Sequence, residues 1–257
     1  EYYYGVKNGI WTSYFPEGDK WRVVQYNNGK DHPAEGWNKE REQTLIAGQG
    51  IIYDYYDNGP LKSKMAVTDS LYNGMAEYYH NNGNLESEGS LLDGEKNGLW
   101  KYYFEGGEKW KHIEYLNGKL DGVIKTWYAN GELNVEGKYK NNYKEGEWVW
   151  YTKEGTVEMK GSFKESKQHD TWTYYFDNGQ VESIGEFAMD QREGEWKMFY
   201  KIGAKWKIGT YHNDKKDGHW QTFFEDGQLL QEGDFSAGKE NGLWSAWYQN
   251  GQLKDEG

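Results

Sequence analysis

The hydrophobic positions of this chain recur at a fixed spacing, and most of them are aromatic. A glycine opens each unit, tryptophan usually follows two positions later, and a ring stands at the fifth position after the glycine. The unit that begins at Gly98 shows this order as Gly-Leu-Trp-Lys-Tyr-Tyr-Phe-Glu-Gly-Gly. Short runs that are rich in aromatic residues and bounded by glycine are typical of β-strands. The pattern therefore predicts one strand at the start of every unit.

Ten such units follow one another. The opening position is held by Gly9, Gly50, Gly74, Gly98, Gly122, Gly146, Asp170 in place of glycine, Gly194, Gly218 and Gly242. A second glycine lies nine residues after each of them, and eight of the nine steps between units are 24 residues long. Only the first step, of 41 residues, is irregular. A period of this length indicates a repeat array in which each unit packs on its neighbours.

Each unit reads as a β-hairpin. Asn-Gly or Asp-Gly recurs at the second glycine, as at Asn58-Gly59 and Asp226-Gly227, and these pairs tolerate the positive φ angles of hairpin turns. A weaker second strand follows, as in residues 228–235, and a polar loop such as residues 140–145 leads to the next unit. Since no segment between strands has a helical pattern, parallel crossovers are excluded.

These observations predict an all-β fold: an elongated single-sheet array of about ten 24-residue antiparallel β-hairpin repeats, forming one domain over residues 1–257. We expect no helix, except within residues 38–47. Side chains alternate along a strand, so the tryptophan and the fifth-position ring should point to opposite faces. The tryptophans are expected to be buried. The fifth-position ladder is a candidate binding surface, with Tyr55, Tyr79, Tyr103 and Trp127 as candidate contacts.

The repeat resembles a known family. Its consensus, Gly-x-Trp-x-x-(Tyr/Phe)-(Tyr/Phe)-x-(Asn/Asp)-Gly-x-Leu-x-x-Glu-Gly, is clearest between Gly218 and Gly257 and is similar to the bacterial variant of the MORN repeat. The resemblance implies a solenoid of antiparallel hairpins with a scaffolding or protein-binding role. Some members are antitoxins of the immunity type, and others are lipoproteins or secreted proteins. The resemblance to this family implies no catalytic residues. Choline-binding cell-wall repeats are a look-alike with a shorter period.

Composition narrows the classes of ligand. The net charge of −12 disfavours nucleic acid and anionic membranes and favours a basic protein partner. Cysteine is absent, and no apolar stretch approaches the length that inserts into a membrane. The six histidines lie at different phases of the repeat, and no catalytic, phosphate-binding or metal-binding motif occurs. We therefore expect no enzyme activity, no cofactor and no metal.

Specific contacts are expected where the repetition fails. An inserted loop at about residues 31–47 contains Trp37, and just after it Ile52 and Ala76 replace the tryptophan. A small residue in a row of large ones predicts a notch, and Trp37 would either cover this notch or present itself to a partner. In three repeats Lys-Trp replaces the usual leucine or valine and shifts the ring by one position, at Trp21, Trp110 and Trp206. Unless a bulge intervenes, the shift predicts rings on the opposite face, where they would either anchor a partner or add local packing.

The sequence favours a non-catalytic protein-binding scaffold, either an antitoxin or immunity-type protein or a subunit of a cell-envelope assembly. The alternative is a glycan-binding or cell-wall-binding module that uses the aromatic ladder. An obligate homo-oligomer is not expected. The chain begins without methionine, partway through a unit, which favours a cell-envelope or secreted location over the cytoplasm.

Overall fold

The computed structural model describes residues 2–257 and consists of β-strands. No helix occurs in this range, so none is long enough to cross a membrane. The chain divides into two compact units, Glu1–Gly131 and Glu132–Gly257. The first unit contains β1 (Tyr2–Tyr3), β2 (Val6–Lys7), β3 (Gly9–Tyr14), β4 (Lys20–Asn27), β5 (Lys30–Trp37), β6 (Gln43–Ile46), β7 (Gln49–Tyr55), β8 (Leu61–Thr68), β9 (Leu71–Tyr79), β10 (Leu85–Leu92), β11 (Glu95–Tyr103), β12 (Lys109–Leu116) and β13 (Lys119–Trp127).

The second unit is built only of repeats. It contains β14 (Leu133–Lys140), β15 (Tyr143–Tyr151), β16 (Val157–Lys164), β17 (Lys167–Tyr175), β18 (Val181–Ala188), β19 (Gln191–Phe199), β20 (Lys205–His212), β21 (Lys215–Phe223), β22 (Leu229–Ser236), β23 (Lys239–Trp247) and β24 (Leu253–Glu256).

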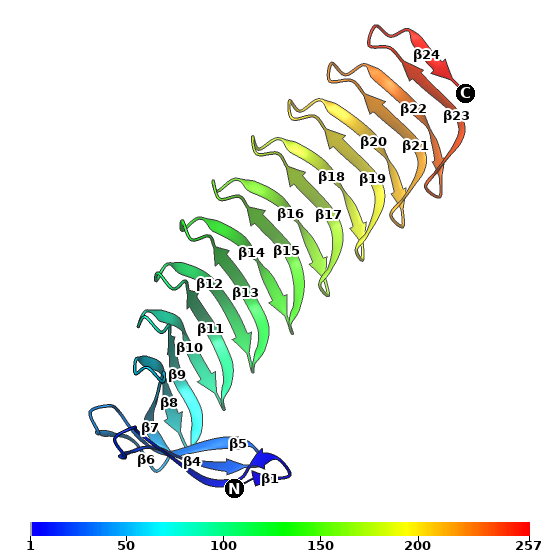
Figure 1. Ribbon diagram of the computed structural model, residues 1–257. Coiled ribbons are helices and arrows are strands. Elements are labelled where there is room, and N and C mark those ends of the chain that lie inside the picture. The colour runs from blue at the N-terminus through cyan, green and yellow to red at the C-terminus, as the bar shows by residue number, and fades with distance from the viewer. Residues whose placement is uncertain (1) are drawn as a thin grey trace. The chain divides into compact units, whose positions relative to one another are not determined.

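Within each unit, the strands pair antiparallel with their neighbours in chain order. In the second unit they lie side by side from β14 to β24 (Figure 1). In the first unit the same order runs from β3 to β13, and β1 and β2 form a separate two-stranded sheet. In the described range, β3 pairs with β4 and β24 pairs with β23. The expected all-β fold of consecutive antiparallel hairpins is confirmed.

Two kinds of turn alternate along the chain. The turn that contains the second glycine is a five-residue loop: between β11 and β12 the Phe104 N–H donates to the Glu108 carbonyl, and the Gly107 N–H donates to the Phe104 carbonyl. The polar connection to the next repeat is the tighter turn. Between β14 and β15 it has only Asn141 and Asn142 at its centre, with φ of 48° and 71°. Positive φ at both central residues is the requirement of a type I′ turn, which explains why asparagine, aspartate and glycine collect there.

The first-glycine position also has a backbone reason. Gly146 has a φ of 66° at the point where the pairing of β14 with β15 shifts register. Asp170 holds the same position in its repeat with a φ of 58°. Aspartate adopts this left-handed conformation more readily than most residues, so the substitution keeps the local geometry.

Six of the seven repeat tryptophans lie against a glycine of the preceding strand. A Cβ atom added at Gly161 would lie 2.2 Å from Cδ2 of Trp172, and five further glycine–tryptophan pairs have the same arrangement. The indole N–H of Trp172 donates to the Ser162 carbonyl at 3.1 Å. Five of the seven tryptophans are buried, as expected, namely Trp100, Trp148, Trp172, Trp196 and Trp220. Rings on the second strand, such as Phe163 at 5.2 Å from Trp172, fill the space between successive indoles.

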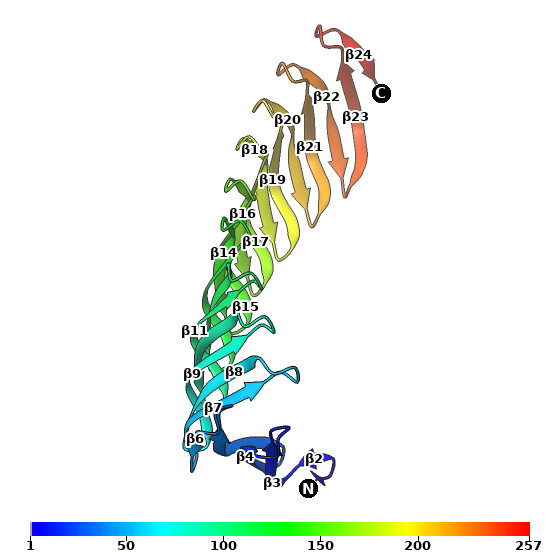
Figure 2. The ribbon, with the colours of Figure 1, turned by 60° about the vertical axis from the view of Figure 1, so that its left-hand side comes forward.

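The inserted residues 31–47 are not a loop. Residues 30–37 form β5 and residues 43–46 form β6, which adds a hairpin to the sheet and leaves a short loop at residues 38–42. The prediction of an inserted loop was therefore wrong, as was the allowance for a helix within 38–47. The aromatic period that marks the other strands is missing here, although β5 and β6 complete the hydrogen bonding of β4 and β7. Figure 2 shows β4 running across the direction of β8 and β9 in this first unit.

The predicted notch is filled. Ile52 is 2% exposed and packs with Leu45 and Val67, and Ala76 is fully buried. Met65 is the Cα partner of Ala76 and stands where other repeats have glycine. A longer side chain on one strand thus replaces the ring that is missing from the next. Neither Ile52 nor Ala76 is available to a partner, so that prediction was wrong.

Candidate binding cleft

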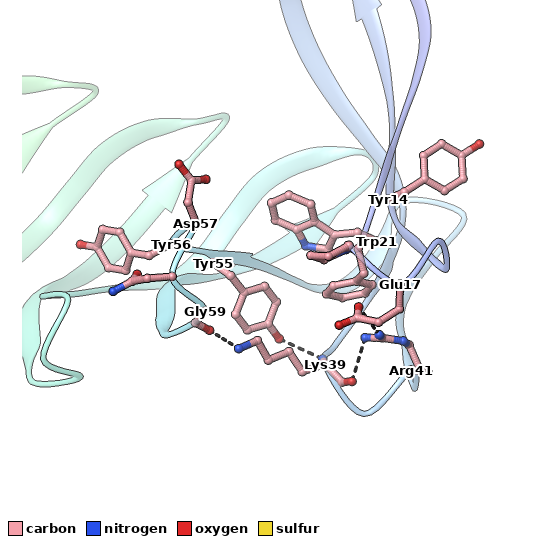
Figure 3. Close-up of a pocket in the computed structure, with 12 residues that line it drawn as sticks. Tyr14, Glu17, Trp21, Lys39, Arg41, Tyr55, Tyr56, Asp57 and Gly59 are labelled. Carbon is pink, nitrogen blue, oxygen red and sulfur yellow. Dashed lines mark hydrogen bonds and ion pairs between the residues drawn. The ribbon is translucent and has the colours of Figure 1, made fainter.

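An aromatic cleft of about 600 Å³ lies in the first unit, between the turn after β3, the loop at residues 38–42 and the turn after β7. We call it the N-terminal cleft (Figure 3). It is lined by Tyr14, Phe15, Pro16, Glu17, Trp21, Lys39, Arg41, Tyr55, Tyr56, Asp57, Asn58 and Gly59. The residues come from two successive repeats and from the inserted hairpin.

Three rings form one wall: Phe15 from the turn after β3, Trp21 from β4 and Tyr55 from β7. Phe15 lies 6.0 Å from Trp21 and 6.1 Å from Tyr55, and Trp21 lies 6.2 Å from Tyr55, measured between ring centroids. The indole N–H of Trp21 donates to the Tyr53 carbonyl at 2.9 Å, which ties β4 to β7. Burial raises the pKa of the Tyr55 hydroxyl, so the group is neutral at physiological pH. The wall is a fixed apolar surface with polar atoms at its edge.

The loop at residues 38–42 brings two cations to this wall. The Arg41 guanidinium lies 4.1 Å from the Phe15 ring centroid and donates to Glu17 and Asp19 at 2.8 Å each. The Lys39 ammonium lies 5.1 Å from the Tyr55 ring centroid and bonds to the Gly59 carbonyl, as Figure 3 shows. Cations over aromatic faces are attracted to the ring quadrupole. The contacts of Lys39 and Arg41 therefore show that the aromatic wall can bind a cationic group.

The N-terminal cleft joins two of the predicted site residues, Trp21 and Tyr55. Trp37 lies half-buried at the end of β5, with the Lys20 ammonium 5.7 Å from its ring centroid, and is not part of the cleft wall. Lys39 and Arg41 have no repeat signal. Their only sequence clue was their place in the insertion.

The other fifth-position rings have local partners. The hydroxyl of Tyr103 donates to Glu88 at 2.9 Å, and that of Tyr79 donates to Glu77. Burial and these carboxylates raise the pKa of both hydroxyls to about 12. Trp127 makes an edge-to-face contact with His112, at 4.6 Å between centroids. These residues stabilise the sheet, and the structure does not gather them into the N-terminal cleft.

Two of the three displaced tryptophans are exposed, whereas Trp21 is half-buried, and the strand pairing is irregular at each of the three. Trp110 is 43% exposed and Trp206 is 38% exposed. Trp206 lines a second cleft, of about 480 Å³, in the second unit. In the described range no cluster of histidine, aspartate and glutamate has the geometry of a metal site.

Comparison with known proteins gives one family. The sequence model described as the MORN repeat variant matches residues 7–28, 72–93, 120–141, 144–165, 171–188, 216–237 and 240–257. None of the curated proteins matches the chain.

Several solved structures match most of this chain at low similarity. A crystal structure of TcdB2-TccC3-Cdc42 matches 94% of this chain at 12% identity with a TM-score of 0.23, and one of TcdB2-TccC3 does so with a TM-score of 0.20. The Tc holotoxin pore of Photorhabdus luminescens, in a TccC3 mutant form, matches 95% at 12% identity with a TM-score of 0.21. This chain spans 16% of each of those chains. At such TM-scores the similarity supports no conclusion about activity.

Proposed function

Because this chain belongs to the MORN repeat variant family, we propose that it is a non-catalytic scaffold that binds another protein. The family suggests a repeat-containing binding scaffold. The observation that supports the proposal is the N-terminal cleft, where an inserted hairpin interrupts the repeats and opens an aromatic wall flanked by charged groups. Buried aromatic anchors surrounded by polar groups are typical of protein-binding sites.

The charge of the chain favours a basic partner. The net charge is −12, and Asp57 at the edge of the cleft has no hydrogen bond or ion pair within the described residues. Complementary charge accelerates association and selects among partners more than it raises affinity. Two roles fit this chemistry, an immunity-type protein that neutralises a toxin and a subunit of a cell-envelope assembly.

The test uses surface variants, because deleting residues 31–47 would remove β5, β6 and the buried Leu45. Tyr14 lines the cleft and is 58% exposed, so Tyr14→Ser changes the binding surface with little effect on packing. Tyr143→Ser is the matched control, since Tyr143 is 56% exposed and lies on β15 in the second unit. The partner is first isolated from the source cells by affinity capture and identified.

We expect Tyr14→Ser and Asp57→Asn each to weaken that complex by about tenfold, the loss of about 1.4 kcal/mol, while Tyr143→Ser leaves it unchanged. Equal affinity of all variants would remove the N-terminal cleft from consideration. The glycan-binding alternative is supported by the same aromatic wall, since flat rings also stack on sugars. Saturable binding of purified cell-wall glycan, lost in Tyr14→Ser while no protein is captured, would establish it instead.

A further inference from the structure

The second cleft repeats the construction of the N-terminal cleft at equivalent positions of the repeat. In the second unit, Trp206 lies twelve residues after the opening Gly194, as Trp21 does after Gly9. Trp206 packs on Tyr200 at 6.1 Å between ring centroids, and the equivalent pair of Trp21 and Phe15 lies at 6.0 Å. The same displaced tryptophan on the same neighbouring ring thus borders a cleft in both units.

A carboxylate completes both clefts. Glu225 lies in the turn after β21 and lines the second cleft, and Asp57 is the equivalent residue of the N-terminal cleft. Both follow the opening glycine of their repeat by seven residues. The third displaced tryptophan, Trp110, has Ala129 at the equivalent place. The chain therefore contains a natural comparison, a similar ring without the carboxylate.

The charges that line the second cleft are predominantly negative. Glu182 and Glu225 have no ion pair or hydrogen bond within the described residues, whereas Lys201 is paired with Asp177 at 2.5 Å. Phe176, Phe199, Tyr200 and Trp206 supply the aromatic walls. The Lys207 ammonium already lies 4.2 Å from the Trp206 ring centroid, which shows that this ring accepts a cation. Aromatic faces beside unpaired carboxylates are suited to a cationic group.

We propose that the second cleft binds the guanidinium of an arginine in a basic protein segment. A planar guanidinium can stack on Trp206 while it donates to a carboxylate, whereas a lysine ammonium offers only a point charge. Glu182 and Glu225 supply the carboxylates, and the apolar wall accepts the methylene groups of the side chain. The site deepens the proposed binding function by naming the group recognised, and it lies in a different unit from the N-terminal cleft.

The test is a titration of the full chain labelled with 5-fluorotryptophan, followed by ¹⁹F NMR. The Trp21, Trp110 and Trp206 signals are assigned by single substitutions. The probes are acetyl-Gly-Arg-Gly-amide, its lysine analogue and its citrulline analogue, at constant ionic strength. We expect the arginine peptide to shift the Trp206 signal saturably, the lysine peptide to bind at least threefold more weakly, and citrulline, which is neutral, to have no effect. The Trp110 signal should not respond.

Charge variants locate the site. Glu225→Gln and Glu182→Gln should each weaken the arginine peptide at Trp206 by at least fivefold, whereas Glu158→Gln, an exposed glutamate on β16, should not. All three positions are on the surface, so folding is checked by the unchanged dispersion of the other tryptophan signals. A Trp206 signal that ignores arginine, that responds equally to citrulline, or that is insensitive to both glutamate variants would overturn the proposal. These outcomes are independent of whether Tyr14→Ser affects capture of the partner.

Discussion

Replacing Gly161 by alanine tests the central packing rule of the array. The added Cβ would lie 2.2 Å from Cδ2 and 2.5 Å from Cγ of Trp172. Carbon atoms in contact are separated by about 3.5 Å or more, so the ring or the strand must move by about 1.3 Å. The φ of Gly161 is outside the left-handed region, so the backbone itself accepts alanine. The expected effect is therefore purely one of packing.

The ring has little freedom to move. Trp172 is 1% exposed, and its N–H donates to the Ser162 carbonyl. Trp150 lies at 5.7 Å and Phe163 at 5.2 Å from it, between ring centroids. Overpacking costs about 1–3 kcal/mol, and weakening the indole hydrogen bond costs about 1 kcal/mol more. We expect Gly161→Ala to lower the free energy of unfolding by about 2–4 kcal/mol.

The assay is denaturant unfolding combined with hydrogen exchange of β16 and β17, because repeat arrays can unfold in more than one step. Lys160→Ala, at an exposed neighbouring position, is the control and should change stability by no more than about 0.5 kcal/mol. The pair Met65 and Ala76 suggests the rescue. Gly161→Met combined with Trp172→Ala should be more stable than the sum of the two single losses predicts, by about 2 kcal/mol. Unchanged protection of β16 in Gly161→Ala, or strict additivity in the double variant, would refute the reasoning.

Two further predictions concern single residues. Gly218 has a φ of 69° with open space around the missing Cβ, so Gly218→Val should lower the free energy of unfolding by about 1–2 kcal/mol through backbone strain alone. Gly218→Asp should lower it less, because Asp170 adopts the same conformation in its own repeat. Thermal unfolding of the two variants measures the difference. Hydrogen bonds to Asp234 and then Glu232 raise the pKa of His219 above 6.5. The stabilising effect of protonated His219 is complete below the unfolded-state pKa and is lost as pH rises through the folded-state pKa. An NMR titration of His219 should therefore give a midpoint above 6.5. His219→Gln should remove this contribution to the pH dependence of stability.

The period of the sequence was sufficient to predict the hairpins, because every repeat imposes the same local requirements. Gly146 and Asp170 stand where the backbone needs a left-handed residue, and Trp172 stands opposite a glycine that leaves room for its ring. Such requirements are local and appear at fixed spacing. The inserted strands β5 and β6 satisfy requirements of a different kind. Leu45 is buried against Ile52 and Val67, a contact set by tertiary packing that no spacing within residues 31–47 reveals.

The candidate site was likewise predictable only in those residues that belong to the repeat pattern. Trp21 and Trp206 were identified because they break the phase of the repeat, and both line clefts. Lys39 and Arg41 were not, because they reach Tyr55 and Phe15 through the loop of the inserted hairpin. Ile52 also broke the pattern but is buried. A break in periodicity marks a changed environment without saying whether solvent or another side chain occupies it.

The difference between the two kinds of break follows from volume. Where a ring is lost from the tryptophan row, a neighbour can fill the space from within the sheet: Met65 does so opposite Ala76, and Ile113 is the Cα partner of Ile124. Where a ring is added at a displaced position, the filled interior has no room for it, and it remains partly exposed, as Trp206 does. Dense packing thus absorbs deletions and leaves additions on the surface. In this array, extra rings are therefore better guides to exposed surface than missing ones.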